Sequence, residues 1–220
     1  MFAACAAAAL CAACGPTDAR PTPASPEPSS RSRAIDLAKV ARVRSDLPAG
    51  YEIAELAGRA APLAFWGFGP QWVADPPQCG VLSDPPVDVA TVRGWSGSGP
   101  GGIVYVVAGS AGPAIDPGVI GECGTSTLTA GRTSGTVTTV DAPAIDAATT
   151  LGMRTETTTT VEGGTETHSH ADTFTAYLEG YTAYVTVVTD PGSSGPVLDA
   201  DFAAALLVKT VAALRGEAQP

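Results

Sequence analysis

The two histidines of the chain lie on one short stretch together with two carboxylates. Glu166, His168, His170 and Asp172 follow one another at every second position, so on a β-strand all four side chains would project from one face. Carboxylate and imidazole groups in such a row could bind Zn²⁺ or Cu²⁺ loosely. The alternative is a solvated strand face beside a hairpin turn, which needs no ligand, and the pattern favours it.

Two serines, Ser96 and Ser98, lie in the glycine-rich segment GWSGSGPGG, which superficially resembles a nucleophile elbow. A nucleophile elbow needs glycine two residues before and after the serine, on a strand-to-helix turn. Ser96 is followed two residues later by Ser98 instead of glycine, and the next element reads as a strand. Nothing favours a Ser–His–Asp triad. We therefore predict no catalytic residues, with a serine hydrolase as the least favoured function.

The first cysteines belong to a predicted export signal. Residues 1–13, MFAACAAAALCAA, are small and apolar, yet too few to span the roughly 30 Å hydrocarbon core of a membrane. They are typical of the end of a signal peptide, and Ala12-Ala13-Cys14 resembles a lipobox. Cys11 replaces the usual leucine, and no basic residue precedes the apolar run, so we expect the true start further upstream. We predict cleavage before Cys14 and lipidation of its thiol.

The remaining cysteines are Cys79 and Cys123, because Cys5 and Cys11 leave with the leader. Two cysteines that remain in an oxidising compartment predict one disulfide. It would close a loop of about 45 residues and stabilise the folded chain by roughly 3–4 kcal/mol. A metal site on this pair is disfavoured, because no other thiol and no nearby histidine would complete it. We expect no cofactor.

The charge of the chain limits its partners. The net charge is −10, from 22 acidic and 12 basic residues. A surface of this sign repels phosphate backbones and anionic headgroups, which argues against nucleic-acid binding. Membrane attachment must then come from a covalent anchor or from another protein.

Five aromatic residues are candidates for a ligand-binding wall. The stretch LAFWGFGPQW is punctuated by glycine and proline, and Trp95 follows later in the chain. Aromatic side chains on loops can wall a cleft for apolar or sugar-like ligands, but they can also fill the core. The sequence leaves both readings open for Phe65, Trp66, Phe68, Trp72 and Trp95.

The elements that would position these residues are mostly strands. The sequence predicts a strand that begins at Tyr51-Glu52-Ile53, a hairpin from 91–96 and 102–108, a strand at 135–140, and a meander of 149–161, 165–178 and 181–189. Residues 35–43 are a short helix or an edge strand, and 115–123 a helical turn. After residue 196 the period becomes helical, with Leu198, Phe202, Leu206, Ala213 and Leu214 predicted on the buried side. We predict an α+β fold: a twisted antiparallel sheet with one or two helices packed on one face.

The domain organisation follows from composition. After the leader, residues 14–33 are rich in proline and serine without apolar periodicity, which predicts a lipidated, disordered tether. Residues 34–216 form a single predicted domain, followed by a tail at 217–220.

Four segments carry a family resemblance: LPAGYEI, FWGFGPQW, DPPQCGVLSDP and RGWSGSGPGGIVYVV. They resemble a family of mycobacterial and actinobacterial envelope lipoproteins of unknown function. This family is distantly related to the extracellular sensor domain of PknH-type receptor serine/threonine kinases. The resemblance implies a sensor-like α+β domain on the outer face of the cytoplasmic membrane.

These observations together predict an exported, lipid-anchored envelope lipoprotein. Its domain is expected to bind a lipid, a glycan or a partner protein without catalysis, in a cleft between sheet and helix. The alternative is a structural or partner-docking module without a small-molecule ligand.

Overall fold

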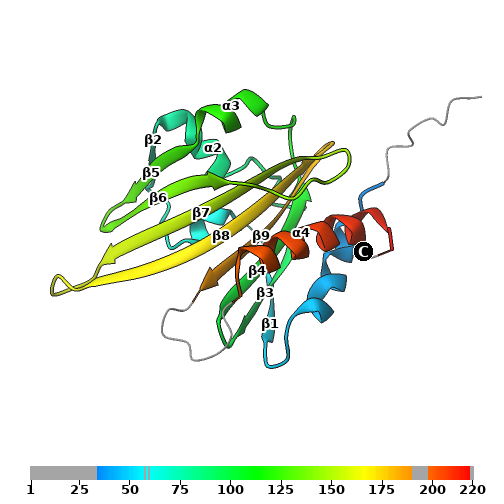
Figure 1. The fold of residues 1–220 in the computed structure, drawn as a ribbon, viewed down its shortest axis with the longest axis horizontal. Coiled ribbons are helices and arrows are strands. Elements are labelled where there is room, and N and C mark those ends of the chain that lie inside the picture. Colours follow the sequence, from blue (N-terminus) through cyan, green and yellow to red (C-terminus); the bar gives the residue numbers. More distant parts are fainter. Residues whose placement is uncertain (1–33, 57, 59, 190–197, 219–220) are drawn as a thin grey trace, which may run out of the picture. The chain divides into compact units, whose positions relative to one another are not determined.

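The computed structural model (Figure 1) describes residues 34–56, 58, 60–189 and 198–218. The predicted leader, Cys14 and the whole predicted tether (14–33) lie outside these residues, as do positions 219–220 of the tail. Among the described residues, nine strands form one antiparallel sheet in the order β1-β3-β4-β9-β8-β7-β6-β5-β2. The strands are β1 (Glu52–Leu56), β2 (Val73–Asp75), β3 (Arg93–Gly99), β4 (Gly102–Ser110), β5 (Thr125–Ala130), β6 (Thr133–Val140), β7 (Thr149–Thr160), β8 (Glu166–Leu178) and β9 (Tyr181–Thr189).

The predicted hairpin and meander are confirmed. β3 and β4 pair across a tight turn, and β7, β8 and β9 pair in sequence order. The β3–β4 turn requires glycine at its end, because Gly102 has φ +141° and a Cβ there would run into the Val188 carbonyl of β9. Two strands were not predicted, β5 and the three-residue β2, which extend the sheet beyond β6.

One face of the sheet is covered by two helices, as Figure 1 shows for α4 (Ala200–Arg215) and the 3-10 helix η1 (Leu37–Asp46). The carboxylate of Asp199 caps α4 by accepting from the Phe202 N–H at 2.9 Å, and Gly216 ends the helix at φ +70°. Leu198, Leu206, Ala213 and Leu214 are buried as predicted, whereas Phe202 is only half-buried. The core beneath these helices contains Trp95, Val104, Val106, Phe174, Ala176, Leu178, Val185, Val187, Leu207 and Val211.

The sequence predicted helices on one face of the sheet, and in the structure the opposite face is covered as well. Short helical turns cover it: α1 (Pro62–Phe65), η2 (Pro77–Cys79), α2 (Gly80–Ser83) and α3 (Pro117–Glu122). Cys79 and Cys123 form the predicted disulfide between η2 and the end of α3, with a Cα–Cα distance of 5.6 Å. Both cysteines pack among Trp66, Phe68, Leu82, Leu128, Val137, Leu151 and Met153. In the described part of the chain, no helix is long and apolar enough to cross a membrane.

Candidate functional site

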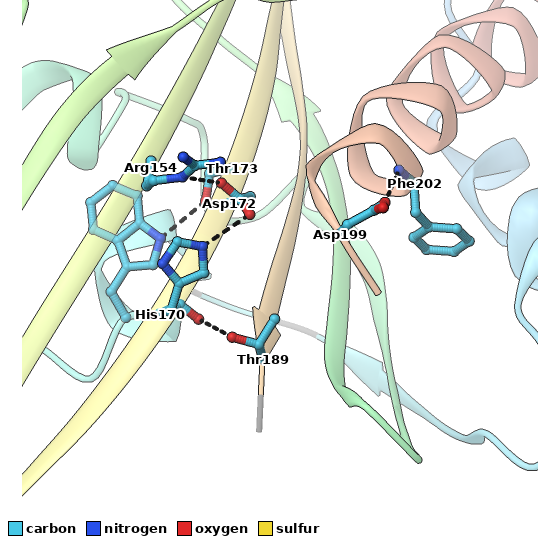
Figure 2. A network of polar contacts seen from close by, with 8 residues as sticks. Arg154, His170, Asp172, Thr173, Thr189, Asp199 and Phe202 are labelled. Carbon is cyan, nitrogen blue, oxygen red and sulfur yellow. Dashed lines mark hydrogen bonds and ion pairs between the residues drawn. The ribbon is translucent and has the colours of Figure 1, made fainter. Parts of the chain in front are cut away.

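A buried carboxylate holds together the polar network shown in Figure 2. Asp172 on β8 lies directly opposite Arg154 on β7, whose Nε donates to its Oδ1 at 3.2 Å. Nε2 of His170 lies 3.1 Å from Oδ2 of the same carboxylate. The Asp172 side chain is 5% exposed, against 48% for Arg154. Because a buried charge is costly unless it is paired, the two neighbours make this position possible for an aspartate.

This network lies in a cleft of about 410 Å³ between β8 and the N-terminal end of α4. The sheet contributes Arg154, His170 and Asp172, and the hydroxyl of Thr189 on β9 donates to the His170 carbonyl at 3.2 Å. The helix side of the cleft is formed by Leu198, Asp199, Ala200 and Asp201. Six of the eight lining residues are therefore polar or charged.

The network leaves hydrogen-bonding groups available to a ligand. Arg154 uses Nε for Asp172, and within the described ranges no residue bonds its two terminal amino groups. The second ring nitrogen of His170 likewise has no partner among the described residues. Guanidinium groups only donate, carboxylates only accept, and imidazole does either according to its tautomer. The cleft can therefore meet ligand groups of both kinds.

The four residues of the candidate metal row are only partly brought together. His170 and Asp172 are in contact, but Glu166 and His168 lie exposed toward the tip of the β7–β8 hairpin. There, Nδ1 of His168 lies 3.0 Å from the Thr158 hydroxyl. Among the described residues, no group of three or more His, Cys, Asp or Glu side chains could hold a metal ion. The strand alternation places the four side chains on one face, but the row is too extended for them to converge.

The five candidate aromatic residues do not line one surface, because they lie on opposite faces of the sheet. Trp95 is fully buried beneath η1, and its indole N–H donates to the Val40 carbonyl at 3.0 Å. Trp66 and Phe68 are buried on the other face, where the Trp66 indole donates to the Thr173 hydroxyl at 3.0 Å. These three side chains are core, which settles the reading left open above.

The other two aromatic residues are partly exposed. Phe65 stacks on Tyr105 of β4, with ring centroids 3.9 Å apart and planes 4° from parallel. Trp72 packs closely over Gly80, where an added Cβ would lie 2.9 Å from its ring. Neither residue borders the polar cleft.

A second, mostly apolar cleft of about 280 Å³ lies on the α1 side of the sheet. The Tyr184 hydroxyl donates to the Ala60 carbonyl at its base. Burial raises the pKa of Tyr184 far above the ordinary value of 10.0, and the nearby Asp84 carboxylate raises it further. The cleft is lined by Ala60, Ala61, Asp84, Pro85, Pro86, Val87, Val89, Val92 and Tyr184.

The serines of the glycine-rich segment are strand residues. Ser96 and Ser98 lie in β3 opposite Tyr105 and Ile103. They alternate with Trp95, so they face the side of the sheet opposite to His170 and Asp172. Neither serine therefore contacts a histidine.

Comparisons with known proteins agree with this fold. A family profile described as a domain of unknown function (DUF5642) matches residues 36–215. An X-ray structure of an uncharacterised protein from Mycobacterium smegmatis, the Rv0999 ortholog, aligns with a TM-score of 0.60 and 24% identity. The alignment covers 83% of this chain and 98% of that protein. No curated protein sequence matches the chain.

Proposed function

The chain belongs to a family of domains of unknown function (DUF5642), and we propose that it is an exported, lipid-anchored envelope lipoprotein whose domain binds a glycan without catalysis. The binding site is the cleft between β8 and α4. The predicted relation to receptor-kinase sensor domains is consistent with a binding role and remains a prediction.

The observation that carries the glycan assignment is the Arg154–Asp172–His170 network in the cleft. Sugar hydroxyls donate and accept hydrogen bonds, as do the groups of this lining taken together. An acyl chain would instead need a mainly apolar pocket, and the cleft offers only Leu198 and Ala200. The net charge of −10 disfavours polyanionic ligands, so the expected glycan is neutral.

Export and anchoring are supported by the cysteines. The leader and Cys14 resemble a lipoprotein signal, and a buried disulfide is typical of oxidising compartments. A diacylglyceryl group supplies two acyl chains, and two lipid chains are what stable membrane anchoring generally takes. The tether then places the domain clear of the membrane surface.

Replacing Cys14 by alanine tests the anchor. In an actinobacterial host we expect the wild-type chain to fractionate with membranes, and Cys14→Ala to accumulate as an unlipidated precursor. Intact-mass spectrometry of both forms distinguishes lipidation from simple retention. A wild-type mature chain cut anywhere other than before Cys14 would overturn this part of the proposal.

Replacing Arg154 by glutamine tests the cleft. Glutamine keeps an N–H donor for the Asp172 carboxylate. It removes the two terminal amino groups of the Arg154 guanidinium, which no described residue bonds. Because hydrogen bonds to charged groups contribute about 1.5–3 kcal/mol, we expect at least a tenfold loss of affinity. The measurement is calorimetric titration of the full chain with neutral oligosaccharides of the maltose, cellulose and chitin series.

The matched control is Arg42→Gln, an exposed arginine of η1 on the outer side of that helix. This variant should bind as the wild type does. If none of the three saccharide series binds, or if Arg154→Gln binds as tightly as the wild type, the cleft is not a glycan site. Binding of phospholipid vesicles without saccharide binding would favour a lipid ligand instead.

A further inference from the structure

The sheet face that forms the cleft continues beyond it as an exposed array of hydroxyl groups. Alternate residues of β5 and β6 point to the same side as Arg154 and are exposed to solvent. We call this set the hydroxyl face; it comprises Thr125, Thr127, Thr129, Ser134, Thr136 and Thr138.

Strand register aligns these residues in rows that lead into the cleft. Thr125 lies opposite Thr138, and Thr138 lies opposite Arg154. In the next row Thr127 lies opposite Thr136, which lies opposite Glu156, and Glu156 lies opposite His170. Neighbouring strands are about 4.8 Å apart, so a row from β5 to β8 spans roughly 14 Å.

We infer that the hydroxyl face binds a linear neutral glycan chain whose end occupies the cleft. This inference rests on the proposed function and adds that the ligand is a polymer lying across the strands. The face extends well past the cleft, so a single sugar would leave the rows on β5 and β6 uncovered.

The chemistry of the face favours a glycan over a protein or a lipid. A threonine hydroxyl donates one hydrogen bond and accepts two, as a sugar hydroxyl does. Protein interfaces are usually anchored by large aromatic or arginine side chains, and the six members of the hydroxyl face include neither. A lipid surface would require apolar or basic residues, which this set also lacks. The charges beside the hydroxyl face are Arg154 and Glu156 at its cleft end and Asp75 of β2, which lies opposite Thr127 at its outer edge. The face therefore carries no excess of positive charge to attract a polyanion.

The test is the double variant Thr136→Val/Thr138→Val in the full chain. Valine has nearly the shape of threonine and a high strand propensity, so the fold should be retained while two hydroxyls are removed. The probes are oligomers of one to six units from the maltose, cellulose and chitin series. Calorimetric titration gives their affinities, and far-UV circular dichroism checks the fold.

For the wild type we expect affinity for at least one series to rise at least tenfold from the shortest oligomer bound to the hexamer. The double variant should bind the shortest oligomer normally but lose most of this rise. Ser98→Ala removes an exposed strand hydroxyl on the other face of the sheet and should change nothing.

The outcomes separate the two proposals. Short saccharides that bind in an Arg154-dependent way, without any gain in affinity with length, would overturn the hydroxyl face and leave the cleft intact. A gain in affinity with oligosaccharide length that persists in the double variant would also overturn the role of the hydroxyl face. Binding of no saccharide would remove the proposed function and this inference with it.

Discussion

Replacing Cys79 and Cys123 together by alanine should lower the free energy of unfolding by about 4 kcal/mol, because the disulfide closes a loop with a sequence separation of 44. In the chain-entropy account, the bond stabilises by restricting the unfolded chain. The bond is buried, with the two cysteines 1% and 2% exposed, so their replacement also removes contacts in the core. Equilibrium urea unfolding, followed by tryptophan fluorescence, measures the change.

The matched control is the wild-type chain unfolded and refolded in the presence of a reductant, which should be destabilised by a similar amount. The disulfide joins the end of α3 to η2, and β3 and β4 separate these two elements along the chain. It therefore connects the short helical turns that cover one face of the sheet. A change below about 1 kcal/mol would show that packing alone holds these turns, and would contradict the prediction.

The second large effect is a loss of stability at alkaline pH. Burial raises the pKa values of Tyr177 and Tyr184 far above the ordinary 10.0. Below pH 10 the folded and unfolded chains both hold these protons, so the contribution to stability is fully present. As the pH rises above 10, the unfolded chain loses them first, and the free energy of unfolding falls. Urea unfolding at pH values from 8 to 12 should show this decline.

Two phenylalanine variants separate the tyrosines. Tyr184→Phe and Tyr177→Phe should each reduce the alkaline slope by about one proton. At neutral pH they should differ: Tyr184→Phe loses the hydrogen bond to the Ala60 carbonyl and is destabilised by about 1–3 kcal/mol. The buried Tyr177 hydroxyl has no hydrogen-bond partner among the described residues, so Tyr177→Phe should be neutral or stabilising. An unchanged alkaline slope in both variants would contradict the assignment.

Local sequence patterns predicted most of the sheet. Runs of threonine, valine and tyrosine separated by glycine turns predicted β7, β8 and β9, because strand preference and turn chemistry are properties of a few neighbouring residues. The helical period after residue 196 predicted α4 for the same reason. β2 was missed because three residues between Trp72 and Pro76 carry too little pattern, and its pairing with β5 is a tertiary event.

The candidate site was less predictable. His170 and Asp172 were recognised from their alternation on one strand, but Arg154 was not, because its role depends on the β7–β8 register. Counting outward from the Glu162-Gly163-Gly164 turn, which is centred on Gly163, would have placed Arg154 opposite Asp172, and this was the available signal. The contribution of Leu198 to Asp201 was beyond sequence reasoning, because nothing local says which strand the start of α4 approaches.

The sequence by itself predicted the antiparallel α+β fold and the Cys79–Cys123 pairing, since these follow from local periodicity, turn chemistry and a count of cysteines. Only the tertiary structure decided that Trp66 and Trp95 lie in separate cores and that the cleft is polar. The side of a sheet on which a residue is covered depends on which distant helix packs there. That choice is made by the burial of apolar surface over the whole domain, and no short segment encodes it.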